Sequence, residues 1–423
     1  MDATNGFTLS ARLIGKGLSR VPRNGKNHPV APQFAPLDGE AHGQYNDAMM
    51  ADIQQVEARV VLEVSLSKLR ANYRKVARAV APLQVMAILK ANAYGLGVRT
   101  IAQALRQEGV LWFGVAALRE AVEIADIGAR ILLLGSVLPD EIPAAIAHDF
   151  TLPVSDLASA RLIDAEAKRQ GKMAKGHLAI DSGMGRLGIP IAAAATHIPE
   201  IAGLENLKCE GIYSHFPFAY GDSDFSNHQV TALLHLMDGL EQKGIRFAHA
   251  HIANSDGIHN IDASRRPPFT IARTGINLYG CFDLEGRQTL PLEPVLSLRS
   301  RLIAIRDLPW GASIGYGRTH TLKKPTRVGT VAIGYADGLP LQLSDCGHLS
   351  IRGKDCPILG RISMDYTTVS LEDAPDASVG DEVVCLGGEG MHSLTVEDWA
   401  ALKNTHPYEI ICSFGNRVER RYV

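Results

Sequence analysis

Eight short apolar runs alternate with helix-like segments between residues 85 and 272, and this recurrence constrains the fold more than any other feature. The runs are Val85–Leu89, Trp112–Ala116, Ile131–Leu134, Phe150–Val154, His177–Ile180, Glu210–Ser214, Ala248–Ile252 and Phe269–Ala272. Helical patterns lie between them, for example at residues 98–109, 156–170, 192–203 and 225–243. Near-continuous apolar strands that alternate with helices are typical of a parallel sheet buried on both faces. Eight such units predict a closed (β/α)₈ barrel.

A doubly wound open sheet is the alternative arrangement for this alternation. Such a sheet binds phosphate at a G-x-G-x-x-G fingerprint directly after its first strand. No such fingerprint follows the first apolar run of this chain. We therefore expect an α/β protein with an N-terminal (β/α)₈ TIM barrel.

The segments on either side of the eight runs show a different pattern of strand-like and helix-like stretches. Val60–Val64 is strand-like, and Ser67 begins a segment with apolar residues at helical spacing, namely Leu69, Tyr73, Val76 and Val80. After residue 292, Pro, Gly and Asp separate further strand-like runs, which are Leu296–Ile305, Arg327–Ile333, Leu349–Arg352, Tyr366–Leu371 and Glu382–Leu386. Little helical pattern intervenes before residues 395–403, which predicts a mainly β C-terminal domain.

Residues 1–58 do not follow the pattern of the rest of the chain. Residues 1–30 carry five basic side chains against one acidic side chain, and residues 31–58 carry five acidic ones. A secretory signal needs a continuous apolar stretch after its basic start, and here Arg12, Lys16 and Gly17 interrupt it. We expect a flexible N-terminal extension at 1–58 or a segment that drapes over a neighbour, with an unusual targeting sequence as the alternative. The barrel would then occupy 59–292 and the β-rich domain 293–423.

The overall composition excludes several classes of function. Of the 423 residues, 46% are hydrophobic, and 43 basic side chains balance 45 acidic ones. This balance supports neither nucleic-acid binding nor a polybasic membrane patch. No apolar run approaches the roughly 18 residues needed to cross a bilayer. The six cysteines form no C-x-x-C pair, so we expect no metal site, and reduced thiols in a cytoplasmic protein.

Polar side chains follow the apolar runs at the points where the predicted strands end. They are Lys90, Asp181, Arg186, His215, Asn254, Ser255, Arg273 and Thr274. Barrel enzymes form their active sites at the carboxyl ends of the strands. We therefore expect these residues to converge on one site.

A lysine at the end of a buried strand is costly unless it serves a site. Desolvation lowers its pKa and makes the amine of Lys90 nucleophilic, as an imine-forming lysine requires; the alternative is a lysine that extends into solvent. Backbone N–H groups near Ser255, Gly275 and Ile276 would form the usual phosphate site of such barrels. A phosphate-bearing cofactor joined to a lysine suggests pyridoxal 5′-phosphate (PLP). Arg273 would either face its pyridine nitrogen or close the barrel rim by a salt bridge.

Nine short motifs, which lie in family order along residues 60–423, resemble those of the alanine racemase family. They are A-x-x-K-A-N-A-Y-G (87–95), D-S-G-M-G-R-L-G (181–188), S-H-F (214–216), H-x-A-N-S (251–255), A-R-x-G-I-x-L-Y-G (272–280), G-Y-G (315–317), G-Y-A-D-G (334–338), G-R-I-S-M-D (360–365) and P-Y-E-I (407–410). Each motif alone is weak, and together they are specific. The resemblance implies a PLP-dependent racemase that interconverts L- and D-alanine as a homodimer with shared active sites.

The resemblance also implies roles for individual residues. Lys90 would hold PLP covalently and act as one base, and Tyr316 of the opposite subunit would act as the other. His215 would lie against the cofactor ring and reach Tyr316, while Arg273, supported by His251, would bond the pyridine nitrogen. The phosphate would be held by Tyr94, Ser255, Gly275, Ile276 and Tyr408, with Asn254 beside them. Arg186 would bond the cofactor's phenolic oxygen and, with the backbone of Met364, the substrate carboxylate.

Racemisation explains the need for two bases. A proton must leave one face of a carbon and another must arrive on the opposite face, so both bases must lie within hydrogen-bond reach of Cα. The pKa of a free tyrosine is about 10, so Tyr316 needs a nearby cation, which the His215–Arg273 pair would provide. A permanent cation at Arg273 would also discourage protonation of the pyridine nitrogen, which favours racemisation over transamination.

Four positions depart from the family pattern, namely Ala179, Leu341, Leu96 and Tyr220. Ala179 stands where the family often has a lysine modified to a carbamate, and Leu341 where it often has an arginine. Without the carbamate, Arg186 would be held by another group or by a bound anion such as chloride, and we expect the anion. A serine racemase or a racemase of broader specificity is therefore the near alternative.

Three other functions compete with racemisation. The β-rich domain argues against a PLP-binding carrier protein, and the lack of a G-G-G motif argues against a decarboxylase of the same fold. A class I aldolase would use Lys90 directly on a carbonyl substrate, without PLP.

Overall fold

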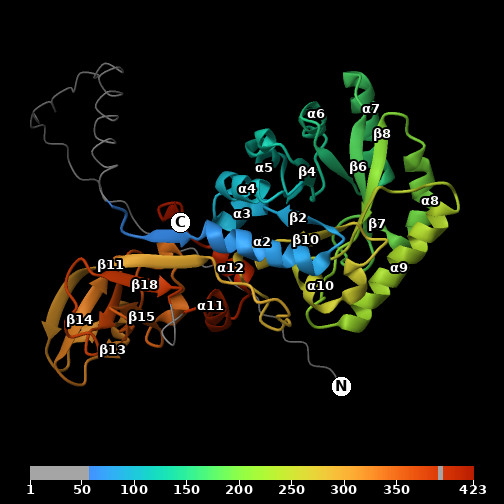
Figure 1. Ribbon diagram of the computed structural model, residues 1–423. Helices are drawn as coiled ribbons and strands as arrows, with labels where there is room; N and C mark the ends of the chain where they lie inside the picture. Colours follow the sequence, from blue (N-terminus) through green and yellow to red (C-terminus); the bar gives the residue numbers. More distant parts are fainter. Residues whose placement is uncertain (1–56, 389–393) are drawn as a thin grey trace, which may run out of the picture. The chain divides into compact units, whose positions relative to one another are not determined.

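The computed structural model describes residues 57–388 and 394–423 (Figure 1). The extension predicted at 1–58 falls almost entirely outside these residues.

Eight parallel strands form the predicted barrel. They are β2 (Gln84–Ile88), β3 (Trp112–Val115), β4 (Arg130–Leu133), β5 (Thr151–Val154), β6 (Ala174–Asp181), β8 (Leu207–Tyr213), β9 (His249–His251) and β10 (Ile271–Thr274). They pair in the order β10-β2-β3-β4-β5-β6-β8-β9. The last gap is bridged by backbone hydrogen bonds from Thr270 N–H to the Ala250 carbonyl (2.9 Å) and from Arg273 N–H to the Ala253 carbonyl (3.0 Å). The nearly closed barrel confirms the predicted fold class.

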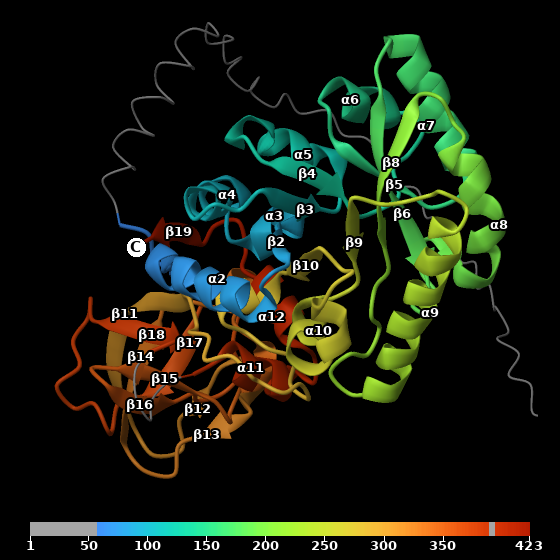
Figure 2. The ribbon, with the colours of Figure 1, turned by 45° about the vertical axis from the view of Figure 1, so that its right-hand side comes forward.

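Helices follow the strands and cover the outside of the barrel (Figure 2). They are α2 (Leu66–Val80), α4 (Val98–Gln107), α5 (Leu118–Glu123), α6 (Ile142–Ala147), α7 (Leu157–Gln170), α8 (Ile191–Ala202), α9 (Ser223–Glu241) and α10 (Ser255–Asn260). The short segment α3 (Lys90–Gly95) instead lines the carboxyl end of the barrel, and its backbone is left-handed. Helix α7 shows why the local sequence sets these bounds. The Asp156 side chain accepts from Ser159 N–H at 2.6 Å, and Gly171 ends the helix at φ 62°, as an N-cap and a C-terminal glycine do.

The barrel interior is filled by apolar side chains, with one histidine among them. Met86, Ile88, Trp112, Leu132 and Ile271 form a buried cluster. The ladder between β6 and β8 shifts register at Gly176–His177, which places His177 opposite Gly211. A Cβ at residue 211 would lie 2.5 Å from the His177 ring. A glycine at 211 is therefore what allows a buried imidazole at this level of the barrel.

The second part of the chain is mainly β, as predicted. Its strands are β11 (Leu296–Leu308), β12 (Ser313–Ile314), β13 (His320–Thr321), β14 (Thr326–Val331), β15 (His348–Ile351), β16 (Lys354–Pro357), β17 (Thr367–Ser370), β18 (Glu382–Leu386) and β19 (Glu419–Tyr422). The predicted helix near 395–403 is α11 (Val396–Lys403), and a further helix, α12 (Pro407–Cys412), follows it. All five predicted runs correspond to strands, whereas the short strands β12, β13, β16 and β19 went unpredicted.

The first strand, β1 (Val61–Val64), belongs to this second sheet and not to the barrel. It pairs antiparallel with β11 and parallel with β19. The barrel predicted at 59–292 included this strand, which the structure assigns to the second sheet. Periodicity identified the strand correctly but could not identify its partners, which lie more than 200 residues away.

Helix α2 connects the two sheets, and a buried asparagine fastens it. The helix begins at Leu66, one residue before the predicted start, because Ser65 caps it by accepting from Lys68 N–H. Asn72 is fully buried. Its amide donates to the Leu278 carbonyl at 3.2 Å and to the Glu293 carbonyl at 2.8 Å, and its oxygen accepts from Glu293 N–H at 2.8 Å.

We expect Asn72→Ala to lower the free energy of unfolding by about 2–3 kcal/mol, because it leaves buried backbone groups unpaired. Urea denaturation followed by circular dichroism would measure this change. Lys68→Ala, on the exposed side of the same helix, is the matched control and should change stability by less than about 0.5 kcal/mol. Equal stability of the two variants would contradict the role of Asn72.

Candidate active site

A cavity of about 350 Å³ opens at the carboxyl end of the barrel. Among its lining residues are Lys90, Tyr94, Arg186, His215, Asn254, Ser255, Arg273, Gly275 and Tyr408. They come from the ends of the barrel strands and, for Tyr408, from α12 of the second part of the chain. Ile276 is buried directly after Gly275. The structure therefore brings together the residues predicted at strand ends, except Asp181 and Thr274. The Asp181 carboxylate accepts from the N–H groups of Gly183, Met184 and Gly185 and holds the loop that follows β6.

Tyr316 and Met364 lie elsewhere and do not line this cavity. Their side chains are 73% and 53% exposed on the β-rich part of the chain. Tyr335 and Tyr366, which the sequence analysis did not single out, are exposed in the same part. Within one chain the cavity thus holds only one of the two predicted bases.

Lys90 is presented to the cavity by a strained turn. The four residues after it, Ala91–Tyr94, have φ between 52° and 59°, in the left-handed helical region. An L-residue in this conformation is destabilised by about 1–2 kcal/mol, so the surrounding structure must hold the turn in place. The pKa of Lys90 is lowered by burial and then by the nearby positive charge of Arg186. Both effects favour the neutral, nucleophilic amine.

Arg273 is a buried cation at the floor of the cavity, with only 3% of its surface exposed. One guanidinium nitrogen, Nη2, donates to the carbonyl of Ser214 at 2.8 Å and to that of Ile252 at 3.2 Å. Burial lowers the pKa of Arg273 to about 10. The side chain therefore remains protonated at neutral pH in spite of its desolvation.

Two histidines accept hydrogen bonds from Arg273. Nη1 lies 2.7 Å from His251 Nδ1, and Nη2 lies 3.0 Å from His215 Nδ1. Burial, followed by the charge of Arg273, lowers the pKa of His215 to about 3 and that of His251 well below its usual value. Both rings are therefore neutral, with their protons on Nε2. His251 Nε2 then donates to His177 Nδ1 at 3.0 Å.

A small cradle lies where the sequence predicted a phosphate site. Gly275 N–H donates to the Ser255 hydroxyl at 3.0 Å. The Tyr94 hydroxyl is so close that a Cβ at residue 275 would lie 2.1 Å from it. The Tyr408 ring lies beside that of Tyr94, with the centroids 6.0 Å apart, while Asn254 accepts from Gly257 N–H at 2.8 Å and caps α10. Hydroxyl and backbone N–H donors packed around a glycine suit a phosphate group.

The side of the cavity that contains Arg186 lacks a counter-charge. Ala179 has only a methyl group there. Its neighbour on β8 is Tyr213, whose ring stacks on His251 with the centroids 5.0 Å apart and which carries no acidic group. In the part of the chain that the structure describes, Arg186 makes no ion pair. Its side chain is exposed in the single chain.

The other departures from the family pattern lie away from the cavity lining. Leu96 is fully buried in the main core, and Leu341 packs against that core. The Tyr220 ring contacts Phe218 edge to face at 4.8 Å between centroids. Within a single chain, none of these three side chains lines the cavity.

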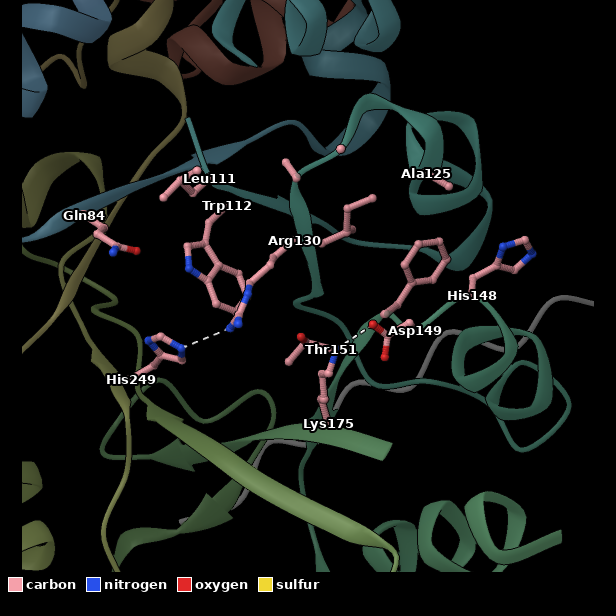
Figure 3. Close-up of a pocket in the computed structure, with 14 residues that line it drawn as sticks. Gln84, Leu111, Trp112, Ala125, Arg130, His148, Asp149, Thr151, Lys175 and His249 are labelled. Carbon is pink, nitrogen blue, oxygen red and sulfur yellow. Dashed lines mark hydrogen bonds and ion pairs between the residues drawn. The ribbon is translucent and has the colours of Figure 1, made fainter. Parts of the chain in front are cut away.

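A second cavity, of about 510 Å³, lies at the opposite end of the barrel (Figure 3). The first residues of several strands line it, such as Trp112 and His249. Its charged groups are paired with neighbours: Lys175 lies 2.5 Å from Asp149, and Arg130 lies over the Trp112 ring at 5.1 Å. It has neither a lysine at a strand's carboxyl end nor a phosphate cradle, so it is not the candidate active site.

Three residues near the site escaped the sequence analysis. Tyr213 directly precedes the S-H-F motif, and His177 lies within a predicted strand. The sequence therefore predicted that both residues lie in barrel strands, but it did not predict which side chains they contact. Glu120 on α5 bonds the backbone beside Lys90 at 2.6 Å, and no sequence signal pointed to it. Within residues 57–388 and 394–423, we find no group of three His, Cys, Asp or Glu residues that could hold a metal, and no helix suited to cross a bilayer.

The donor set fits PLP. Lys90 can supply the amine, the cradle at Ser255 and Gly275 can hold a phosphate, and buried Arg273 offers a cation to a ring nitrogen. This fold and site define a class: (β/α)₈-barrel enzymes that work through a reactive lysine beside a phosphate-binding cradle.

Comparisons with known proteins identify the family within that class. The models of the alanine racemase N-terminal and C-terminal domains match residues 64–283 and 295–422. Alanine racemase 2 of Caldanaerobacter subterraneus subsp. tengcongensis is 35% identical over 368 residues, which cover 86% of this chain and 94% of the relative. The chain therefore belongs to the alanine racemase family and is an amino-acid racemase. The family depends on PLP.

Solved structures agree with this assignment. The alanine racemase of Clostridium difficile 630 has a TM-score of 0.82 at 30% identity, with 87% of this chain and 97% of that chain covered. The alanine racemase of Bartonella henselae, with covalently bound pyridoxal phosphate, has a TM-score of 0.77 at 28% identity, with 87% and 100% covered.

The lowered pKa of Lys90 makes a prediction about its reactivity. A group whose pKa is lowered becomes neutral, and so nucleophilic, at a lower pH. We expect the rate of Lys90 acetylation by acetic anhydride, measured by mass spectrometry, to reach half its maximum below the ordinary lysine pKa of 10.5. A midpoint at or above that value would contradict the environment described for Lys90.

Proposed function

We propose that the protein interconverts L- and D-alanine, with PLP bound to Lys90 and with each active site completed by Tyr316 from a second copy of the chain. The observation that carries this proposal is the division of the two bases. Lys90 lies in the cavity with Arg273 and His215, whereas Tyr316 is 73% exposed and outside it. A homodimer that brings the β-rich part of one chain to the barrel mouth of the other would complete the site.

The residues of the cavity would divide the binding of PLP between them. Ser255, Gly275 and Ile276, with Tyr94 and Tyr408, would hold the phosphate, and Asn254 would keep Ser255 in place by capping α10. Arg273 would donate to the ring nitrogen, and His215 would lie against the ring. When bound, PLP withdraws electrons from the substrate and acidifies its Cα proton.

The two bases would act on opposite faces of the same carbon. Lys90, with its lowered pKa, can take a proton from Cα as a neutral amine. Tyr316 of the second copy would return a proton to the other face, and would take it in the reverse direction. Arg186 and the backbone of Met364 from the second copy would hold the substrate carboxylate so that Cα stays between the bases.

Arg273 would set the electrostatics of the reaction. With a pKa of about 10 it is protonated at neutral pH, and it is a donor to every group it contacts. It would therefore keep the ring nitrogen free of a proton, and this favours return of the proton to Cα over transamination. The same cation would stabilise the phenolate of Tyr316. His215 accepts a hydrogen bond from Arg273 and is neutral, so the positive charge of the pair is that of Arg273.

We expect Tyr316→Phe to reduce racemisation of L-alanine by roughly a hundredfold or more, because one of the two bases is lost. Attachment of PLP to Lys90, followed by its absorbance, should be unchanged because Lys90 and the residues that would hold PLP are unaltered. Loss of optical rotation, with assays for ammonia and pyruvate, would measure racemisation separately from other reactions. Tyr366→Phe, on the same part of the chain, is the matched control, and full turnover in Tyr316→Phe would refute the two-base proposal.

A serine or broad-specificity racemase is the second candidate function, and the observation that favours it is the small, uncharged Ala179 beside Arg186. The racemisation assay run across a series of amino acids distinguishes the two. A preference for alanine supports the first proposal, and equal rates with serine or larger amino acids support the second. The cytoplasmic location remains a prediction.

We also propose that a chloride ion lies beside Arg186 once the second copy covers it. Arg186 is exposed in the single chain, so the cost of an unpaired guanidinium arises only in the dimer. Replacing chloride by gluconate should then raise the KM for alanine, by roughly threefold to tenfold. Ala179→Glu, which supplies a fixed negative charge, should abolish this dependence on chloride. An unchanged KM in chloride-free buffer would contradict the anion.

A further inference from the structure

The turn after Lys90 needs a restraint at its first peptide. Four consecutive L-residues, Ala91–Tyr94, have left-handed backbone angles, and none of them is glycine. Such a turn persists only where neighbouring groups hold it. Its first residue matters most for Lys90, because the peptide between Lys90 and Ala91 sets the direction in which the lysine leaves the backbone.

Glu120 on α5 supplies the restraint at that peptide. Its Oε1 accepts from Ala91 N–H at 2.6 Å. Its Oε2 accepts from Ala116 N–H at 2.9 Å and from Ala117 N–H at 3.2 Å. One carboxylate therefore ties the turn after β2 to the loop after β3 and uses both of its oxygens to do so.

A backbone bond from Ala93 N–H to the Leu89 carbonyl (2.9 Å) closes the turn, and the other side chains that bond it hold its far end. Asn92 accepts from Val98 N–H at 2.7 Å. Arg420 and Tyr422 on β19 donate to the carbonyls of Gly95 (3.1 Å) and Leu96 (2.9 Å). These contacts stabilise the exit from the turn. Among the described residues, Glu120 is the side chain that bonds the peptide next to Lys90.

We propose that Glu120 is a positioning residue for Lys90, which holds the left-handed turn so that the lysine amine points into the cavity. This proposal rests on the proposed function only in the use that Lys90 makes of its position. A carboxylate is needed because it offers an acceptor to each loop. An amide would turn its NH₂ group toward a backbone N–H on one side and leave that donor unpaired.

The charge of Glu120 is a second, measurable contribution. It raises the pKa of Lys90, in opposition to burial and Arg186, which lower it. Removing the charge should therefore lower the pKa of Lys90 further, whereas a purely structural role elsewhere in the fold would leave it unmoved. The Lys90 pKa thus reports on the proximity that the geometry requires.

The test compares Glu120→Gln with Glu123→Gln, a control on the same helix whose carboxylate is exposed. In the full-length protein, we expect Glu120→Gln to slow the attachment of PLP to Lys90 by about tenfold, because the Ala91 N–H loses its charged acceptor and the left-handed turn loses its restraint. Borohydride reduction and mass spectrometry of the Lys90 peptide would measure attachment without reference to activity. Glu123→Gln should match the wild type.

A second readout separates this proposal from the proposed function. Acetylation of Lys90 by acetic anhydride across a range of pH is measured on protein freed of PLP, so that the amine is unblocked, and in Glu120→Gln its midpoint should move to lower pH. Glu120→Asp retains the charge but is one methylene shorter, so it should slow attachment while leaving the midpoint nearly unchanged. This variant also serves if Glu120→Gln does not fold.

The outcomes are distinct. Wild-type attachment rates in both Glu120 variants, or a midpoint in Glu120→Gln equal to that of Glu123→Gln, would overturn the positioning role. Absence of PLP attachment in the wild type, with the acetylation shift present, would refute the proposed use of Lys90 and would support the positioning role of Glu120.

Discussion

The buried guanidinium of Arg273 is the interaction on which the site depends. A desolvated cation is stable only when its hydrogen-bond donors are satisfied, and here the donors reach the carbonyls of Ser214 and Ile252 and two imidazole nitrogens. Because Arg273 can only donate, His215 and His251 must accept at Nδ1. The protonation state of both rings therefore follows from the arginine, and the ends of β8, β9 and β10 are held together around it.

Lys90 depends on a different kind of stabilisation. Its chemistry needs a neutral amine that points into the cavity, and burial beside Arg186 lowers its pKa. Its direction comes from a strained left-handed turn, which is maintained by Glu120 on one side and by the C-terminal strand β19 on the other. The strand that ends the chain thus restrains the loop that carries the reactive lysine, which links the β-rich part of the chain to the barrel's chemistry.

The barrel was predictable because each of its strands is an apolar run between helical segments, and the strand ends mark where catalytic residues of a barrel gather. Lys90, His215 and Arg273 could be chosen for that reason. The sheet to which β1 belongs was not predictable, since its partners β11 and β19 are distant in sequence. Asn254 lines the cavity, and its carboxamide oxygen also caps α10, a contact that residue type alone could not reveal.

The sequence by itself determined the order of strands and helices and the residue types at the strand ends, because hydrophobic periodicity and local caps act over a few residues. The family motifs, in their order along the chain, also determined which lysine and which arginine belong to the site, namely Lys90 and Arg273. Only the tertiary structure decided how Glu120 reaches Ala91, how His251 donates a hydrogen bond to His177, and how α12 brings Tyr408 to the barrel. The reason is physical: these contacts join segments far apart in the chain, and their geometry exists only once the barrel has closed.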